Sequence, residues 1–300
     1  MLLGQQCLEG FKAFRQKDGQ IRIFRADQSA LRMQHSAYFI AAQAPPIDLF
    51  LKAVHLAVAK NAEYVPPYGT GASLYIRPLL FSSRPQFRLT PPKDFTFVVY
   101  VLPIGVYRGA KPTDCLIVEN FDRAAPFGVG NAKVGGNYAP VFLHTQLARK
   151  AGYNTTLHLD SSTRTYIDEF SNSGFLAIRP PTTPGGLPTL VIPDSATAIK
   201  SITSASIVDI ARKHLGWPVE VRKVHYKELE SFSEVFAAGT AAGLLPIKSI
   251  ELKSKGLKKV YCHTDEPGDG YKQLTGIFKG IQSGQVQDTE GWCQLVVAPA

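Results

Sequence analysis

A lone lysine lies in the glycine-rich stretch GVGNAKVGGNYAP at residues 128–140. Glycines stand on both sides of Lys133, and Tyr138 follows shortly after it. Glycine lets another group come close to the backbone, and an amine held away from water loses part of its proton affinity. The stretch therefore indicates either a bound anion or a bound carbonyl compound beside the lysine.

Other uses of such a lysine do not fit the residues around it. A phosphate-binding P-loop needs Ser or Thr directly after the lysine, where this chain has Val134. The GxGxxG, HExxH and GxSxG patterns are missing as well, and we expect no metal site. Carbonyl chemistry remains, and its common cofactor is pyridoxal phosphate, which acts as an electron sink. That cofactor needs a lysine, donors for its phosphate and an acid beside its pyridine nitrogen.

The composition limits the remaining classes of protein. A chain of 300 residues favours two domains. The net charge of +9 comes without the zinc-finger spacing or the aromatic pattern of nucleic-acid binders, so we expect no nucleic-acid partner. No run approaches about 18 apolar residues, so we expect no membrane span. The four cysteines form no CxxC pair. The chain does not open with the basic and apolar segments of a secretory signal peptide. Both observations favour reduced thiols and a cytoplasmic location.

Hydrophobic periodicity predicts a small α+β domain over residues 1–107, followed by a connection and first strand at 108–130 and a large domain at 131–300. In the small domain we expect a hairpin at 10–25, helices near 27–42 and at 45–61, and strands at 72–81 and 95–107. In the rest of the chain we expect a strand at 114–121, helices at 138–153 and 201–217, strand–turn–strand at 155–181, and an apolar segment with a central turn at 233–250.

Several blocks of the chain match one family in order. They are GQQCLEGFKAFR (4–15), FRADQSALRMQHSA (24–37), YVPPYGTGASLYIRPLLF (64–81), GNAKVGGNYAP (130–140), YIDEF (166–170), SITSASIVDIA (201–211) and EVFAAGTAAGLLPI (234–247). Together they resemble the class IV pyridoxal-phosphate aminotransferases, above all the branched-chain amino acid aminotransferases, and most of all fungal members. The resemblance implies a two-domain α+β fold of type IV, similar to D-amino acid aminotransferase, with pyridoxal 5′-phosphate between the domains.

The resemblance also implies which residues meet the ring of the cofactor. Lys133 would bind it covalently and carry the proton between substrate and cofactor. Tyr138 would donate a hydrogen bond to the phenolic oxygen. Glu169 would meet the pyridine nitrogen, because a carboxylate stabilises the pyridinium through a charge-assisted bond. Asp168 is the rival for that place, and alternation along a strand lets only one of the two serve.

The phosphate of the cofactor would have ligands from three places. Arg32 would bind it, with Arg25 as the less favoured rival, because a guanidinium suits phosphate bidentately. Ile202 and Thr203 would donate backbone N–H groups from the start of a helix, where the dipole favours an anion. Thr240 would add its hydroxyl.

The resemblance places the substrate beside these groups. The turn Thr240–Ala241–Ala242 would hold the α-carboxylate through backbone amides. The side-chain pocket would comprise Leu8, Gly10, Tyr75, Arg77 and Tyr107. In the family this arginine can pair with the side-chain carboxylate of glutamate or 2-oxoglutarate, so that one pocket serves both substrates of a ping-pong cycle.

The chain departs from the family pattern at several positions. Leu8 replaces an aromatic residue, Ile199–Lys200–Ser201 replaces the usual turn before the phosphate-binding helix, and Gly174 stands where the family has Asn. The chain also begins almost at the family's first block, so we expect either a shortened small domain or a missing segment. Residues 242–245 lack the CxxC of the mammalian members, and we expect no thiol switch there.

The expected reaction is transamination of branched-chain or other apolar L-amino acids with 2-oxoglutarate by a homodimer. One alternative is a same-fold enzyme of other specificity, such as a D-amino acid aminotransferase, an aminodeoxychorismate lyase or an aminotransferase of secondary metabolism. Another is a non-catalytic remnant. The expected location is the cytoplasm, or the mitochondrion if a segment precedes this chain.

Overall fold

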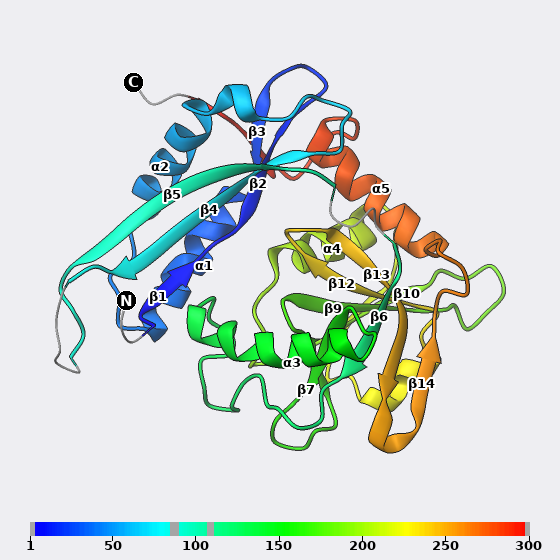
Figure 1. The fold of residues 1–300 in the computed structure, drawn as a ribbon. Coiled ribbons are helices and arrows are strands. Elements are labelled where there is room, and N and C mark those ends of the chain that lie inside the picture. The colour runs from blue at the N-terminus through cyan, green and yellow to red at the C-terminus, as the bar shows by residue number, and fades with distance from the viewer. Residues whose placement is uncertain (1–3, 85–89, 107–110, 298–300) are drawn as a thin grey trace. The chain divides into compact units, whose positions relative to one another are not determined.

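The computed structural model describes residues 4–84, 90–106 and 111–297. Contacts divide the chain into two compact units, which Figure 1 shows as ribbons. The first unit comprises Met1–Val106, Ala132–Gly136 and Lys279–Ala300, and the second comprises Tyr107–Asn131 and Asn137–Phe278. The division differs from the one expected from the sequence, which kept residues 131–300 together, because two later segments pack on strands of the first unit.

The first unit contains a six-stranded antiparallel sheet and two helices. The sheet has the order β1-β4-β2-β3-β15, and β5 pairs with the other edge of β4. The strands are β1 (Gln6–Leu8), β2 (Phe11–Arg15), β3 (Ile21–Phe24), β4 (Ser73–Ser82), β5 (Phe95–Ile104) and β15 (Cys293–Leu295). The helices are α1 (Ala26–Phe39) and α2 (Ile47–Ala59), followed by the short η1 (Ala62–Tyr64). These elements confirm the expected hairpin, helices and strands.

One face of this sheet carries the core of the first unit. Strand β4 alternates between buried and half-buried residues, as the two-residue period of a strand requires. Leu74 and Ile76 are fully buried in the same cluster as Met33 of α1 and Phe50 of α2. The intervening residues of β4 therefore lie on the opposite face.

The second unit contains a nine-stranded mixed sheet. Its order is β11-β10-β9-β12-β13-β6-β7-β8, with β14 paired to β13, and β8 also pairs with β9. The strands are β6 (Thr113–Ile117), β7 (Thr155–Leu159), β8 (Ile167–Phe170), β9 (Ser173–Arg179), β10 (Thr189–Pro193), β11 (Val219–Arg222), β12 (Glu234–Gly239), β13 (Gly243–Leu252) and β14 (Leu257–Val260). Strand β8 pairs with both β7 and β9, so the strands from β9 to β8 in this order form a closed ring.

Helices and short turns complete the second unit. They are η3 (Gly135–Asn137), α3 (Ala139–Lys150), α4 (Ile202–Lys213), η4 (Tyr226–Ser231), η5 (Lys253–Lys255) and α5 (Asp269–Ser283). The division between the two units falls inside η3 and inside α5, so each of these elements belongs partly to the first unit and partly to the second. In the described parts of the chain, no helix has both the length and the apolar character needed to cross a membrane.

The segment 155–181 differs from the expected strand–turn–strand. It forms three strands, β7, β8 and β9. The extra reversal lies between Phe170 and Ser173, which face each other in the β8–β9 pairing. The centre of that turn is Ser171–Asn172; both are common turn residues, but no glycine or proline reinforces them.

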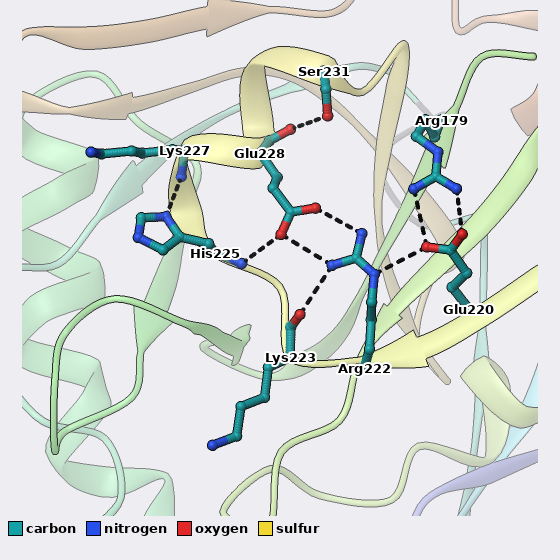
Figure 2. Close-up of polar contacts among 8 residues, drawn as sticks. All are labelled: Arg179, Glu220, Arg222, Lys223, His225, Lys227, Glu228 and Ser231. Atoms are coloured by element: carbon teal, nitrogen blue, oxygen red, sulfur yellow. Dashed lines mark hydrogen bonds and ion pairs between the residues drawn. The ribbon is translucent and has the colours of Figure 1, made fainter. Parts of the chain in front are cut away.

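The edge strand β11 is fastened by ion pairs that Figure 2 shows in close-up. Arg179 of β9 binds Glu220 through both terminal nitrogens. Arg222 lies between two carboxylates: its Nε is 3.0 Å from Glu220 Oε2, and its Nη2 is 2.7 Å from Glu228 Oε2. Glu228 also accepts from the backbone of His225 and completes a capping box at the start of η4. Charges along an exposed edge also discourage pairing with another strand.

Candidate active site

The Lys133 segment is anchored by its backbone inside the first unit. Lys133 N–H donates to Ser36 Oγ of α1 at 2.9 Å, and Lys133 C=O accepts from the N–H of Leu8 at 3.0 Å. The flanking Ala132 and Val134 are buried in the core of the unit, whereas Lys133 is half-buried. These contacts therefore fix the backbone of the lysine between two core residues.

Arg32, the expected phosphate ligand, forms an ion pair with Glu9. Its Nε and Nη2 each lie 2.7 Å from a different carboxylate oxygen of Glu9. The Glu9 side chain is fully buried, and that of Arg32 is 11% exposed. This bidentate pair fixes the plane of the guanidinium. The rival Arg25 instead lies over the ring of Trp292, 5.0 Å from its centroid.

Three of the expected substrate residues share the sheet face opposite the core. Leu8 pairs with Leu79 of β4, and Tyr75 and Arg77 lie further along the same strand. Directly opposite residues of neighbouring strands share a face, so Leu102 and Tyr100 of β5 lie beside them. Both are more than half exposed. The face is therefore apolar apart from a few polar groups. Tyr107 lies outside the described residues.

Tyr75 and Arg77 form a local pair that depends on Gly10. Arg77 Nη2 is 3.0 Å from Tyr75 Oη, and its guanidinium lies over the Tyr75 ring at 5.0 Å. A Cβ at Gly10 would lie 2.1 Å from Tyr75 Oη. The tyrosine hydroxyl thus leaves no room for a side chain at residue 10, so a glycine is required there.

In the second unit, Glu169 is buried and held by a cation and a backbone amide. Its Oε1 is 2.8 Å from Arg123 Nη1, and the two side chains are 4% and 3% exposed. The N–H of Ile199 donates to the same oxygen at 3.1 Å. A buried carboxylate needs such partners to stay ionised.

The rival Asp168 is bound elsewhere. It accepts hydrogen bonds from Ser195 Oγ at 2.7 Å and Thr197 Oγ1 at 2.9 Å. Burial raises its pKa, and these two hydroxyls oppose the rise. The β7–β8 register shifts between His158 and Leu159, so Asp168 is the extra residue of a bulge. The neighbouring carboxylates therefore have separate partners.

Gly174 makes room for the start of α4. It lies directly opposite Glu169 on β9. A Cβ there would lie 2.6 Å from Ser204 Oγ and 3.3 Å from Ser201 Cβ. The first turn of α4 therefore lies against the sheet face that carries Glu169, and the missing side chain of the glycine allows this approach.

The remaining expected residues of this unit lie at ends of elements. Ile202 and Thr203 open α4, whose N-cap Ser201 accepts from the Ser204 N–H. Thr240, Ala241 and Ala242 form the turn between β12 and β13. Tyr138 directly precedes α3 and lines a cavity of about 190 Å³ together with Ser171 and Asn172.

The sequence reasoning missed two charged residues, Glu9 and Arg123, which bind Arg32 and Glu169. Arg123 lies in a polar stretch before the glycine loop, and nothing in its spacing marks it as buried. A lone acid directly before Gly10, between the apolar residues Leu8 and Phe11, was a usable signal for Glu9. Within the described residues no cluster of three or more His, Cys, Asp or Glu could hold a metal ion.

The groups on the Glu169 face fit pyridoxal phosphate. The first turn of α4 offers backbone amides to an anion, and the Ser204 hydroxyl there is buried without a hydrogen-bond partner in the described part of the chain. On the same face Glu169 supplies a carboxylate held by a cation. The donor set thus suits the phosphate end and the pyridine end of the cofactor.

The chain is similar to known proteins over most of its length. A family model described as amino-transferase class IV matches residues 6–250. Aminotransferase atnJ of Emericella nidulans is 50% identical over 295 residues, which cover 98% of this chain and 84% of that protein. Branched-chain amino acid aminotransferase gloG of Glarea lozoyensis is 46% identical over 300 residues, covering 99% and 83%.

Solved structures show the same fold. The branched-chain amino acid aminotransferase from Escherichia coli matches with a TM-score of 0.78 at 26% identity, covering 98% of this chain and 90% of that one. The branched-chain amino acid aminotransferase from Thermobaculum terrenum, in its holo form with pyridoxal phosphate, matches with a TM-score of 0.78 at 23% identity and the same coverage. The expected α+β fold of type IV is confirmed. The chain therefore belongs to the class IV aminotransferases, which use pyridoxal 5′-phosphate as their cofactor.

Proposed function

We propose that this enzyme transfers the amino group of an apolar L-amino acid to 2-oxoglutarate, and that its amino donor is a specialised one, as in secondary metabolism. The observation that carries the proposal is the face of Leu8, Tyr75 and Arg77, which combines apolar surface with the basic side chains of Arg77 and of Lys12, the β2 residue opposite Tyr75. Such a face suits an apolar side chain in one half-reaction and a carboxylate in the other.

The choice of a specialised donor over ordinary branched-chain metabolism has two supports. Leu8 replaces the aromatic residue expected from the family pattern, and a smaller side chain leaves more room on this face. Among relatives of similar identity, gloG is named for branched-chain amino acids, whereas atnJ, and poxL of Penicillium oxalicum, are named only as aminotransferases.

We also propose the roles of the site residues. Lys133 binds the cofactor and moves the proton, Tyr138 orients the phenolic oxygen, and Glu169 with Arg123 keeps the pyridine nitrogen protonated. Phosphate ligands are Arg32, Ile202, Thr203 and Thr240, and substrate ligands are Leu8, Gly10, Tyr75, Arg77, Tyr107, Ala241 and Ala242. The bound cofactor supplies an electron sink for the substrate Cα. The protein residues hold it and direct the proton.

The working unit is proposed to be a homodimer in the cytoplasm. Phe142, Leu143 and Leu147 of α3 are each at least half exposed, and Phe127 is fully exposed. Large exposed apolar side chains that gather on one element mark interaction surfaces. Light scattering after gel filtration measures the mass, and a monomeric mass contradicts the dimer.

A donor panel tests the proposed reaction. The purified holoenzyme is mixed with 2-oxoglutarate and each of several L-amino acids, and glutamate formation is followed. We expect turnover with apolar L-donors and the best rate with a donor larger than valine. D-amino acids as the only donors would favour the D-amino acid alternative, and pyruvate release from aminodeoxychorismate would favour the lyase. No turnover with any donor would favour the remnant.

A further inference from the structure

A buried histidine lies beside Glu169, and the roles proposed above do not use it. His158 of β7 pairs directly with Glu169 of β8, so the two side chains leave the same face of the sheet. His158 is 1% exposed. The ring of Phe121 meets its imidazole edge-on at 6.0 Å and stacks on His144 at 4.1 Å.

Two buried nitrogen atoms of this cluster lack hydrogen-bond partners among the described residues. They are His158 Nδ1 and Arg123 Nε. His158 Nε2 lies 3.3 Å from Thr156 Oγ1. If Nε2 carries the proton it donates to Thr156, and Nδ1 is then an acceptor, whereas Arg123 Nε–H is a donor. The two atoms are therefore complementary, and one buried water can satisfy such a pair.

The charge state of the imidazole agrees with an acceptor. Burial lowers the pKa of His158 to about 3, with further lowering by the charges of Arg123 and His144. The ring is therefore neutral at ordinary pH. A neutral ring beside the ion pair adds no competing cation.

We propose that His158 is a positioning residue for Glu169: its imidazole accepts a hydrogen bond from Arg123 Nε through one shared water and fixes the guanidinium that holds the carboxylate. The inference rests on the proposed role of Glu169 at the pyridine nitrogen. Without the acceptor, Arg123 holds Glu169 less firmly, and the pyridine nitrogen gives up its proton more easily. The electron sink is then weaker.

The test compares His158→Leu and His158→Asn with the control Leu157→Val. Leu157 directly precedes His158 on β7, but its side chain lies in the core on the opposite face. Three quantities are measured: the pH midpoint of the visible absorbance change of the holoenzyme, the Kd of the apoprotein for pyridoxal phosphate, and the Tm of the apoprotein. The midpoint reports the charge near the cofactor, which a merely structural role does not move.

We expect His158→Leu to move the midpoint to higher pH, because loss of the pyridinium charge removes a nearby cation. We expect cofactor binding to weaken about tenfold. His158→Asn, which can still offer an acceptor, should recover part of both effects, and Leu157→Val should lower only the Tm. If His158→Leu also lowers only the Tm, the histidine is structural and the inference is overturned.

Glu169→Gln separates this inference from the proposed function. If Glu169→Gln moves the midpoint and His158→Leu does not, only the role of His158 fails. If Glu169→Gln leaves the midpoint unchanged, the proposed role of Glu169 fails, and the role of His158 fails with it.

Discussion

The substitution Gly10→Ala tests whether the Tyr75–Arg77 pair recognises substrate. The new Cβ would lie 2.1 Å from Tyr75 Oη, whereas an ordinary contact begins at 3.4 Å. The hydroxyl must therefore move by about 3.4 − 2.1 = 1.3 Å. A shift of this size breaks the 3.0 Å hydrogen bond from Arg77 Nη2 unless the guanidinium follows.

The expected effect falls on substrate binding rather than stability. Losing one hydrogen bond costs about 1 kcal/mol, which is about a fivefold rise in KM for 2-oxoglutarate. Gly10 does not have a positive φ, so alanine suits its backbone, and the smaller entropy of the unfolded chain offsets the contact by about 0.4–1 kcal/mol. We therefore expect little change in Tm.

Steady-state kinetics of the single and double variants measure this effect. Tyr75→Phe removes the hydroxyl, and the nearest remaining ring atom, Cζ, is 2.9 Å from the added Cβ. Gly10→Ala should then raise KM much less in the Tyr75→Phe background than in the wild type. Gly276→Ala, on α5 with open space around it, is the matched control and should leave KM unchanged. Fully additive effects of Gly10→Ala and Tyr75→Phe would refute the reasoning.

Three further predictions concern the second unit. Arg123→Gln leaves the buried Glu169 without its cation, so the free energy of unfolding in urea should fall by about 3 kcal/mol; an unchanged value would contradict the ion pair seen here. Gly174→Asn would put a Cβ 2.6 Å from Ser204 Oγ and 3.3 Å from Ser201 Cβ, so the Ser204 hydroxyl must turn away and Ser201 must give way by a few tenths of an ångström. We expect the Kd for pyridoxal phosphate to rise, and an equal Kd would count against a role of this turn in binding the phosphate. Glu228→Gln breaks the Arg222 bridge and should cost about 1 kcal/mol at neutral pH. Arg222 lowers the pKa of Glu228 in the folded state. The stabilisation by the bridge is therefore present above the pKa of Glu228 in the unfolded chain and is lost as pH falls through its folded pKa. Urea melts of the wild type and of Glu228→Gln should converge at low pH, and a difference that persists there would count against the bridge.

Local patterns in the sequence predicted most elements of the fold. The Asp18–Gly19 turn and the alternation of β4 identify a hairpin and a strand, because turn chemistry and side-chain period depend only on neighbouring residues. The third strand in 155–181 was not predicted, because the turn after Phe170 has no strong breaker residue. The assignment of 132–136 and 279–300 to the first unit depends on pairings between distant segments, which local patterns do not contain.

Family motifs in the sequence supplied the principal candidate residues of the site. Lys133, Arg32 and Glu169 all lie in such motifs. Their buried partners Glu9 and Arg123 were not predicted, since a charged residue usually indicates exposed surface. Burial of a charge depends on the partner that the fold brings to it. The structural reason for Gly174 likewise lies in α4, about thirty residues later in the chain.

The most direct test of the central claim is to find the lysine that binds the cofactor. The holoenzyme is reduced with borohydride, digested, and its peptides are identified by mass spectrometry. The account predicts a phosphopyridoxyl group on Lys133 in the peptide that contains GNAKVGG, and its loss in Lys133→Ala. Stoichiometric label on another lysine, such as Lys12 or Lys200, in an enzyme that transaminates would contradict it.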